Sequence, residues 1–112
     1  MMETKQRADH SFDKVICPKF EQSFQILGKK WNGLIIDVLL DGPKRFKDLS
    51  GKVCDVSDRV LAERLKELEH EGIVERITCE ETEMRAGYVL TEKGADLRHV
   101  MKEVQNWSNK WL

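Results

Sequence analysis

The sequence predicts an α+β fold that is mainly helical, in which several helices precede a two-stranded hairpin and a final helix. Apolar residues repeat at helical spacing over most of the chain, and the period changes to the alternation of a strand only after Gly72. The 112 residues, 40% hydrophobic and 35% charged, suit one globular domain. We expect residues 1–14 to form a flexible tail and residues 15–112 to form the domain.

Three helices are predicted in the first half of the chain, because glycines and prolines separate three segments with helical spacing. Pro18 suits the first turn of a helix, Gly28 ends the first segment, and Gly42 with Pro43 ends the second. The apolar positions are Phe20, Phe24 and Leu27, then Trp31, Leu34, Ile35, Val38 and Leu39, then Phe46, Leu49 and Val53.

The next helix, from Ser57 to about Glu71, has one face for burial and one for solvent. Ser57 is a good N-cap residue, and Gly72 ends the segment. When each residue advances by about 100°, Leu61, Leu65 and Leu68 fall within a narrow arc. Charged residues lie on the opposite side, namely Arg59, Glu63 and Lys66.

A hairpin and a last helix complete the chain. Residues 73–79 alternate as in a strand, residues 85–90 read as its partner with Ala86, Tyr88 and Leu90 on one side, and residues 80–84 form a polar tip. The last helix, opened by Thr91, has a wide apolar stripe: Leu97, Val100, Met101, Val104, Trp107 and Trp111. This order is typical of a winged helix-turn-helix, in which the hairpin lies beside the reading helix on DNA. On periodicity alone, another small α+β domain fits equally well.

The formal net charge of −1 hides an uneven distribution along the chain. Residues 44–66 contain seven basic and four acidic side chains, whereas residues 67–83 contain seven Glu and only one basic residue, Arg76. Local charge decides where a polyanion docks, so the middle of the chain is the candidate surface for nucleic acid. Ordinary solvated helix faces, or a winged helix that contacts proteins, explain the charge as well; salt-dependent DNA binding would distinguish these readings.

Other classes of protein find little support in the sequence. No apolar run approaches the roughly 20 residues that cross a bilayer, and the N-terminal segment lacks a secretory signal, so we expect a cytoplasmic protein without a membrane partner. His10, His70 and His99 show no local arrangement with Cys17, and there is no glycine-rich phosphate loop, so we expect no enzyme. Chelating CxxC or HxxxH spacing is absent, so we expect neither metal nor cofactor.

Several unusual strings occur in an order that resembles the HxlR family of bacterial transcriptional regulators, which is grouped with MarR-like winged-helix repressors. The strings are Cys17-Pro18, LGKKWNGLII at 27–36, GPKRFKDL at 42–49, LAERLKEL at 61–68, GIVER at 72–76 and LTEKG at 90–94. The resemblance runs from Cys17 to the last residue. It implies a winged helix-turn-helix with a two-stranded wing and terminal dimerisation helices, acting as a homodimer on a palindromic operator in double-stranded DNA.

The resemblance also implies which residues meet DNA, with the helix that starts at Ser57 as the recognition helix. The candidates on this helix are Ser57, Asp58 and Arg59 in its first turn, and Glu63 and Lys66 further along. Arg59 has the fork geometry that reads O6 and N7 of guanine. Three cations around the preceding helix suit phosphates: Lys44, Arg45 and Lys47. For each, the alternative is a solvated surface charge.

The wing departs from the family pattern. Glu83 and Met84 stand where paired prolines are usual, before an arginine that Arg85 matches. Glu80, Glu81 and Glu83 make the tip acidic, which opposes close approach to phosphates, although Arg85 remains a candidate contact in the minor groove.

The apolar terminal segments predict a dimer interface. The expected residues are Phe20, Phe24, Val100, Val104, Trp107 and Trp111. Their apolar width exceeds what one terminal helix on a small domain needs, and aromatic residues are enriched at interfaces. The alternative is that they complete the core of a single chain.

Three cysteines at long spacings predict no disulfide framework. Cys17 precedes a helix near Lys14 and Lys19, where amide dipoles and positive charge stabilise a thiolate. Cys17 also matches the N-terminal cysteine of HxlR-type regulators, some of which sense quinones, diamide or hypochlorite. With its KxWNGLII and GPKRF strings, the sequence resembles this thiol-sensing branch of the family most. A bridge from Cys17 to Cys54 of a second subunit is our hypothesis for a redox switch, and we expect Cys79 to be packed. A structural Cys17 in a regulator with a small-molecule effector, or none, is the alternative.

Overall fold

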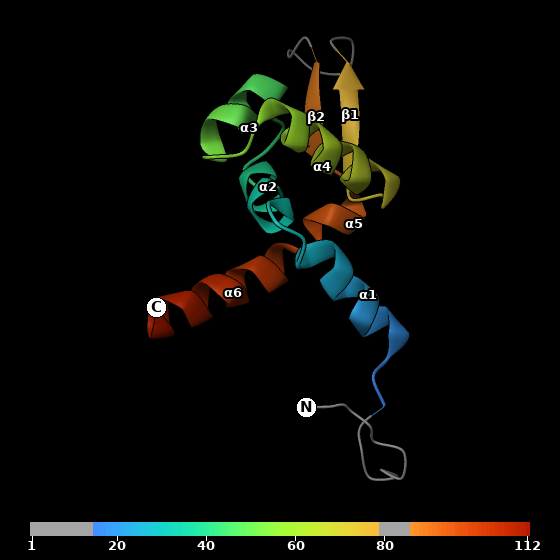
Figure 1. Cartoon of the computed structure of the whole chain (residues 1–112), viewed down its shortest axis with the longest axis vertical. Coiled ribbons are helices and arrows are strands. Elements are labelled where there is room, and N and C mark those ends of the chain that lie inside the picture. The colour runs from blue at the N-terminus through green and yellow to red at the C-terminus, as the bar shows by residue number, and fades with distance from the viewer. Residues whose placement is uncertain (1–14, 79–85) are drawn as a thin grey trace.

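The computed structural model describes residues 15–78 and 86–112, which form six helices and one antiparallel hairpin (Figure 1). In chain order these are α1 (Pro18–Leu27), α2 (Asn32–Leu39), α3 (Phe46–Lys52), α4 (Asp58–His70), β1 (Val74–Thr78), β2 (Ala86–Leu90), α5 (Glu92–Ala95) and α6 (Arg98–Trp111). The predicted tail, the hairpin tip, Cys79 and Arg85 lie outside the described residues. No helix in the described part of the chain has the length and apolar character needed to cross a membrane.

The core is one cluster of buried side chains from α2, α3, α4 and the start of the hairpin. Its fully buried side chains come from three helices: Ile35, Ile36 and Leu39 of α2, Leu49 of α3, and Leu61, Leu65 and Leu68 of α4. Burying each such side chain stabilises the fold by about 1.5–3 kcal/mol. The predicted apolar face of α4 is therefore confirmed.

The apolar stripe predicted for α2 is only partly right. Leu34 is 55% exposed, whereas Ile36, which the helical pattern left out, is completely buried. The physical reason is that α2 packs against several other elements, including α3, α6 and β2, so its buried arc is wide and turned toward Ile36.

The hairpin pairs β1 with β2 in the register Val74↔Leu90 to Thr78↔Ala86. Lys44, just before α3, adds an isolated bridge to β2: its N–H donates to the Tyr88 carbonyl at 3.0 Å, and the Tyr88 N–H donates back at 2.8 Å. The simple alternation predicted for β1 is wrong, since Val74 and Ile77 are buried while Glu75 is exposed. Val74 belongs to the main core cluster and Ile77 does not, because odd and even positions of a strand face opposite sides.

Helix α4 ends as predicted at Gly72, whose φ of 77° is a left-handed conformation that favours glycine. The Ile73 N–H donates to the Leu68 carbonyl at 2.9 Å, which satisfies an acceptor that the helix end would otherwise leave free. The chain then turns sharply from α4 into β1.

The single last helix that the sequence predicted is in fact two helices. Thr91 caps the short α5, accepting a hydrogen bond from the Gly94 N–H at 3.1 Å, and its own hydroxyl donates to the Gly72 carbonyl at 2.5 Å. Asp96 ends α5, and α6 begins after Leu97. The break turns α6 away from the hairpin while Leu97 still packs on the core.

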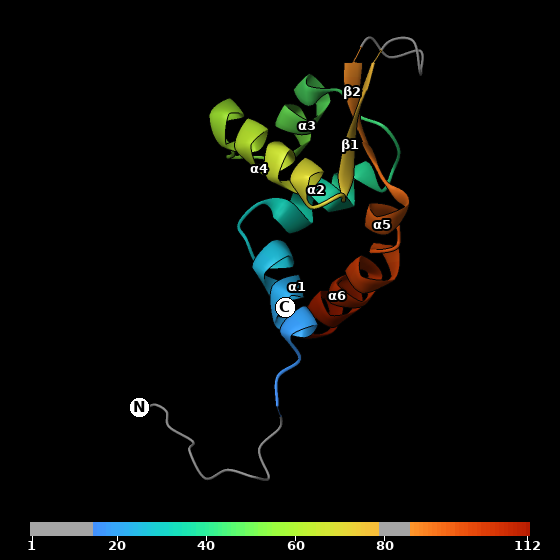
Figure 2. The same ribbon diagram turned by 90° about the vertical axis from the view of Figure 1, so that its right-hand side faces the viewer.

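Helices α1 and α6 project from the body formed by α2–α4 and the hairpin (Figure 1 and Figure 2). Neither helix has a fully buried residue. They contact the core only at their ends nearest the body, through Ile26 and Leu27 of α1 and through Leu97 and Met101 of the α6 region. We call α1 and α6 the arms.

Gly94 provides a test of this packing. A Cβ at Gly94 would clash with the Ile73 carbonyl oxygen, which belongs to the backbone and cannot move aside, so we expect Gly94→Ala to destabilise the fold by about 2 kcal/mol or more. Gly51→Ala is the matched control: nothing lies within 4 Å of that Cβ, and alanine stabilises a helix by about 0.5–1 kcal/mol over glycine. Urea unfolding followed by circular dichroism measures both. Equal stability of the two variants would contradict the packing described.

Candidate DNA-binding surface and cysteine sites

Helices α3 and α4 form a helix-turn-helix whose turn is held by local hydrogen bonds. The Ser57 hydroxyl oxygen accepts from the Val60 N–H at 3.1 Å and caps α4, as the sequence predicted. The Ser50 hydroxyl donates to Oδ1 of Asp58 at 2.8 Å, which joins α3 to the first turn of α4. Asp55 makes the turn with a φ of 70°, a conformation that Asp tolerates better than most residues. The first turn of α4 is thus fixed relative to α3.

The first turn of α4 presents Arg59 to solvent, with its side chain 88% exposed. Its Nε lies 3.8 Å from Oε2 of Glu63, one turn further along the helix. An exposed ion pair of this kind contributes little to stability, so the guanidinium is available to another acceptor. Lys66 is exposed on the same helix.

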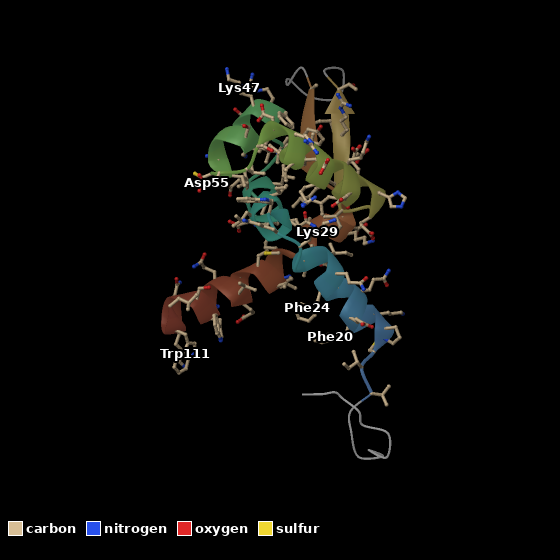
Figure 3. The ribbon with its side chains drawn as sticks, viewed as in Figure 1. Phe20, Phe24, Lys29, Lys47, Asp55 and Trp111 are labelled. Carbon is tan, nitrogen blue, oxygen red and sulfur yellow. The ribbon has the colours of Figure 1, made fainter. Side chains whose placement is uncertain are left out.

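The three cations near α3 differ in how freely they can move. Lys47 is exposed on α3 and lies at the far end of the body from the arms (Figure 3). Lys44 is partly buried, and its Nζ lies 3.5 Å from the Gly42 carbonyl oxygen. Arg45 starts α3, where its backbone N–H and its Nε approach Oδ2 of Asp48 at 3.4 and 3.3 Å.

The Arg45–Asp48 contact also has an electrostatic effect. The hydrogen bond from the Arg45 guanidinium is the main cause that holds the pKa of Asp48 below its usual value of 3.8. Asp48 is therefore ionised at neutral pH, and it offsets the positive charge of Arg45. Of the three cations, Lys47 is the one with neither an ion pair nor a side-chain hydrogen bond among those found in the described residues.

The structure places the six predicted interface residues outside the core of the single chain. Phe20 and Phe24 on α1 are 57% and 60% exposed, and their rings pack edge to face with centroids 5.0 Å apart. Val100, Val104, Trp107 and Trp111 on α6 are exposed as well. Figure 3 shows Phe20, Phe24 and Trp111 on the arms, away from the helix-turn-helix.

The residues of this α6 face form a continuous apolar stripe. Starting from Val100, a step of about 100° per residue puts Val104, Trp107 and Trp111 within an arc of about 60°. A groove of about 580 Å³ follows the stripe and is lined by His99, Val100, Glu103, Val104 and Trp107. Apolar patches of this kind mark interaction surfaces.

The two described cysteines are both free and exposed. Cys17 is the N-cap residue of α1, as expected from Pro18, and its side chain makes no capping hydrogen bond. Cys54 lies in the turn between α3 and α4, next to Asp55. Both views place the start of α1 and this turn at opposite ends of the molecule.

Three charged residues that the sequence analysis did not single out also lie close together. Lys29, in the turn after α1, pairs with Glu67 in the second half of α4, and Glu67 also pairs with Arg64 on the same helix. More than 30 positions separate Lys29 from the other two, so no periodic pattern relates them. The one sign in the sequence that these residues matter is that they lie in the LGKKWNGLII and LAERLKEL strings, which carry the family resemblance. Among the described residues, no group of three His, Cys, Asp or Glu side chains is placed to hold a metal ion.

The family model of HxlR-like helix-turn-helix proteins matches residues 26–112. The chain belongs to this family. The HTH-type transcriptional regulator YodB of Bacillus subtilis (strain 168) is 52% identical to this HxlR-type chain over 96 residues, which cover 86% of each protein. The uncharacterized HTH-type regulator YvaP of the same organism is 43% identical over 97 residues, covering 87% of this chain and 90% of YvaP.

Solved structures agree with the fold of this HxlR-type chain. The reduced form of B. subtilis YodB superposes with a TM-score of 0.76 at 52% identity, covering 87% of this chain and 95% of that one. The quinone-bound form of YodB gives 0.75 at 50% identity and covers 86% and 100%. The redox regulator HypR in its reduced form gives 0.74 at 29% identity and covers 82% and 91%. The predicted family and winged helix-turn-helix fold are confirmed.

Proposed function

We propose that this protein is a homodimeric, DNA-binding transcriptional repressor of the cytoplasm that reads a palindromic operator and uses no cofactor. The observation that carries the proposal is the first turn of α4, which is rigidly capped and presents Arg59 to solvent. A fixed helix start with an exposed guanidinium is the arrangement by which helix-turn-helix proteins read base edges in the major groove.

The candidate contacts fall into two groups by their chemistry. Ser57, Asp58, Arg59, Glu63 and Lys66 belong to the recognition helix, where side chains reach base edges. Lys47 at α3 suits a phosphate best, because its ammonium is exposed, while Arg45 shares its charge with Asp48. Lys44 contributes mainly through its backbone, which joins the wing to α3. Asp58 supports the site by its hydrogen bond from Ser50.

A second copy of the chain is the partner proposed for the arms. Six large apolar side chains on α1 and α6 are exposed in one subunit, which is costly in water and typical of an interface. Two copies related by a twofold axis would bury this patch and present two recognition helices, as a palindromic operator requires.

Oxidation or alkylation of Cys17 is the proposed signal for release from DNA. The thiol is exposed at the N-terminus of α1, where an oxidant or an electrophile can reach it. Relatives in the same family have been solved in quinone-bound and oxidised states, which supports thiol chemistry in this branch. Because the start of α1, which Cys17 caps, lies far from the α3–α4 turn that contains Cys54, a bridge between the two thiols would join two subunits. A regulator in which Cys17 is only structural is the second candidate.

The DNA-reading role is tested by comparing Arg59→Ala with Lys47→Ala, since each variant loses one exposed cation. We select an operator from random duplexes with the wild-type protein and measure affinity by fluorescence anisotropy. Arg59→Ala should lower operator affinity by about 1–3 kcal/mol and relax selectivity at one base pair, because it removes a base contact. Lys47→Ala should weaken binding to operator and random DNA alike. It should also reduce by about 1 the magnitude of the slope of the logarithm of the binding constant against the logarithm of the salt concentration. Identical behaviour of the two variants would contradict these roles, and an absence of DNA binding by the wild type would reject the proposed function.

The dimer is tested by placing a charge in the apolar stripe. Val104→Glu should give a monomer at micromolar concentration, because a buried carboxylate in each subunit opposes association. Asn106→Glu, on the opposite side of α6, adds the same charge and should remain dimeric. Sedimentation velocity distinguishes the two species, and a dimeric Val104→Glu variant would argue against this interface.

The thiol signal is tested by operator binding before and after diamide, which accepts the two electrons and two protons released when two thiols form a disulfide. The wild type should lose affinity about tenfold or more, equivalent to about 1.4 kcal/mol, and regain it with excess thiol. Cys17→Ser should bind with or without diamide, and Cys54→Ser should form no cross-linked dimer on a non-reducing gel. Binding by the wild type that ignores diamide would make Cys17 a structural residue.

A further inference from the structure

The joint between the arm α1 and the body is the short turn of residues 28–31. Because α1 has no fully buried residue, its direction depends on this turn and on the contacts of its last residues. Asn32, the first residue of α2, is 3% exposed, and its Nδ2 donates to the Ile26 carbonyl at 2.8 Å. The last turn of α1 is therefore tied to the start of α2.

A second set of contacts ties the same turn to α4. Nζ of Lys29 lies 3.0 Å from Oε2 of Glu67, and Nε of Arg64 donates to the Lys30 carbonyl at 3.2 Å. Nη1 of Arg64 lies 3.6 Å from Oε1 of Glu67, so the two α4 residues also support each other. These contacts join the turn after α1 to α4, the helix that carries Arg59; Figure 3 labels Lys29 in this turn.

The Arg64 contact is the stronger of the two ties to the turn. Its side chain is only 17% exposed, whereas those of Lys29 and Glu67 are 45% and 43% exposed. Water screens the Lys29–Glu67 pair and leaves it weak, while a charged donor shielded from water holds a carbonyl more firmly. The Lys29–Glu67 pair therefore helps to orient the turn relative to α4 but contributes little to the free energy of the contact.

The turn itself is strained. Trp31 adopts a φ of 82°, which is unfavourable for a bulky side chain, and Lys30 stacks its ammonium 4.9 Å from the Trp31 ring centroid. Among the described residues, the buried Oδ1 of Asn32 has no hydrogen-bond partner. The left-handed φ of Trp31 and the unpaired Oδ1 raise the free energy of this arrangement, whereas the Lys30–Trp31 contact lowers it. Unfavourable features of this kind persist only where surrounding contacts hold them. The contacts from α4 are therefore part of what keeps the turn in this conformation.

We propose that Arg64 and Glu67 are positioning residues that fix the angle between the recognition helix α4 and the arm α1. The inference rests on the proposed function, since the angle matters only in a dimer that reads two half-sites. In such a dimer the arms meet at the twofold axis, and the angle at each joint sets the separation of the two α4 helices. Any displacement of α1 at its Cys17 end is passed through the same contacts to α4.

The test measures how strictly the protein requires one half-site spacing. The operator selected with wild-type protein is compared with versions that are one base pair longer or shorter, a change of about 3.4 Å and roughly 35°. Wild type should lose affinity about tenfold or more on the altered spacings. Glu67→Ala and Arg64→Met should lose less than about threefold between spacings, because a loosened joint lets the helices adjust, at some cost in affinity for the best operator.

Glu69→Ala is the matched control, because Glu69 is also an exposed acid of α4 and makes no side-chain contact found in the described residues. It should keep the spacing preference of the wild type. Diamide gives a second readout: Arg64→Met should retain more operator binding after oxidation than the wild type does. Circular dichroism and sedimentation confirm that each variant is folded and dimeric, and Glu67→Ala serves if Arg64→Met does not fold.

If Arg64→Met and Glu67→Ala bind every operator spacing more weakly than the wild type by the same factor, the two residues have a merely structural role and the inference is overturned. An unchanged spacing preference in both variants would overturn it as well. Failure of the proposed function looks different, because the wild type itself would then show neither operator binding nor a preferred spacing.

Discussion

The burial of one face of α4 in the shared core is the constraint on which the rest of the structure depends. Leu61, Leu65 and Leu68 are all buried on this face and belong to the same core cluster as Ile35 and Ile36 of α2. This burial decides that the other side of α4 is exposed and that its first turn stands beside α3. A recognition surface on a chain of 112 residues can be rigid because the reading helix is itself a large part of the core.

The arms obey a different constraint, because they bury almost nothing within one subunit. Their exposed apolar residues do not stabilise the body, so their position is set by apolar contacts at the ends nearest the core and by a few polar contacts at the joints. At α1 these contacts come from Asn32, Arg64 and Lys29. At α6 the guanidinium of Arg98 donates to the Leu40 carbonyl at the end of α2, at 3.1 Å. Polar contacts of this kind define the direction of an arm with little buried area, which is consistent with the proposed release from DNA on oxidation.

Local sequence patterns predicted the fold where one residue type dictates one backbone geometry. Ser57 as a cap, Gly72 as a left-handed stop and the leucines of α4 each follow from their own chemistry and spacing, and all three predictions are confirmed. The break between α5 and α6 was missed, because Asp96 and Leu97 are compatible with a continuous helix and only packing on the core divides them. The wide burial of α2 was missed for a similar reason, since a helix surrounded by neighbours does not follow a single stripe.

For the candidate site, the sequence predicted which side chains would be charged and exposed. It did not predict which of them would be held by a hydrogen bond or ion pair to a neighbouring residue. The Arg59 side chain is largely exposed to solvent, whereas the Arg45 guanidinium is paired with Asp48. In the sequence the two residues look alike, because both are arginines in a basic segment. The contact from Arg64 to the Lys30 carbonyl joins segments 34 positions apart, and such distant pairs leave no periodic signal. The family resemblance supplied the role of α4, which composition and spacing alone left open.

The short bridge between Lys44 and Tyr88 has a consequence for the behaviour of the protein at high concentration. Open strand edges can recruit strands from other molecules and so start aggregation. In this hairpin, Lys44 occupies the outer edge of β2 at its centre, whereas among the described residues β1 pairs along its length with β2 alone. The outer edge of β1 is short and has Glu75 and Arg76 exposed along it, and charges at an edge discourage the addition of a further strand. The described part of the hairpin is therefore a poor template for self-assembly.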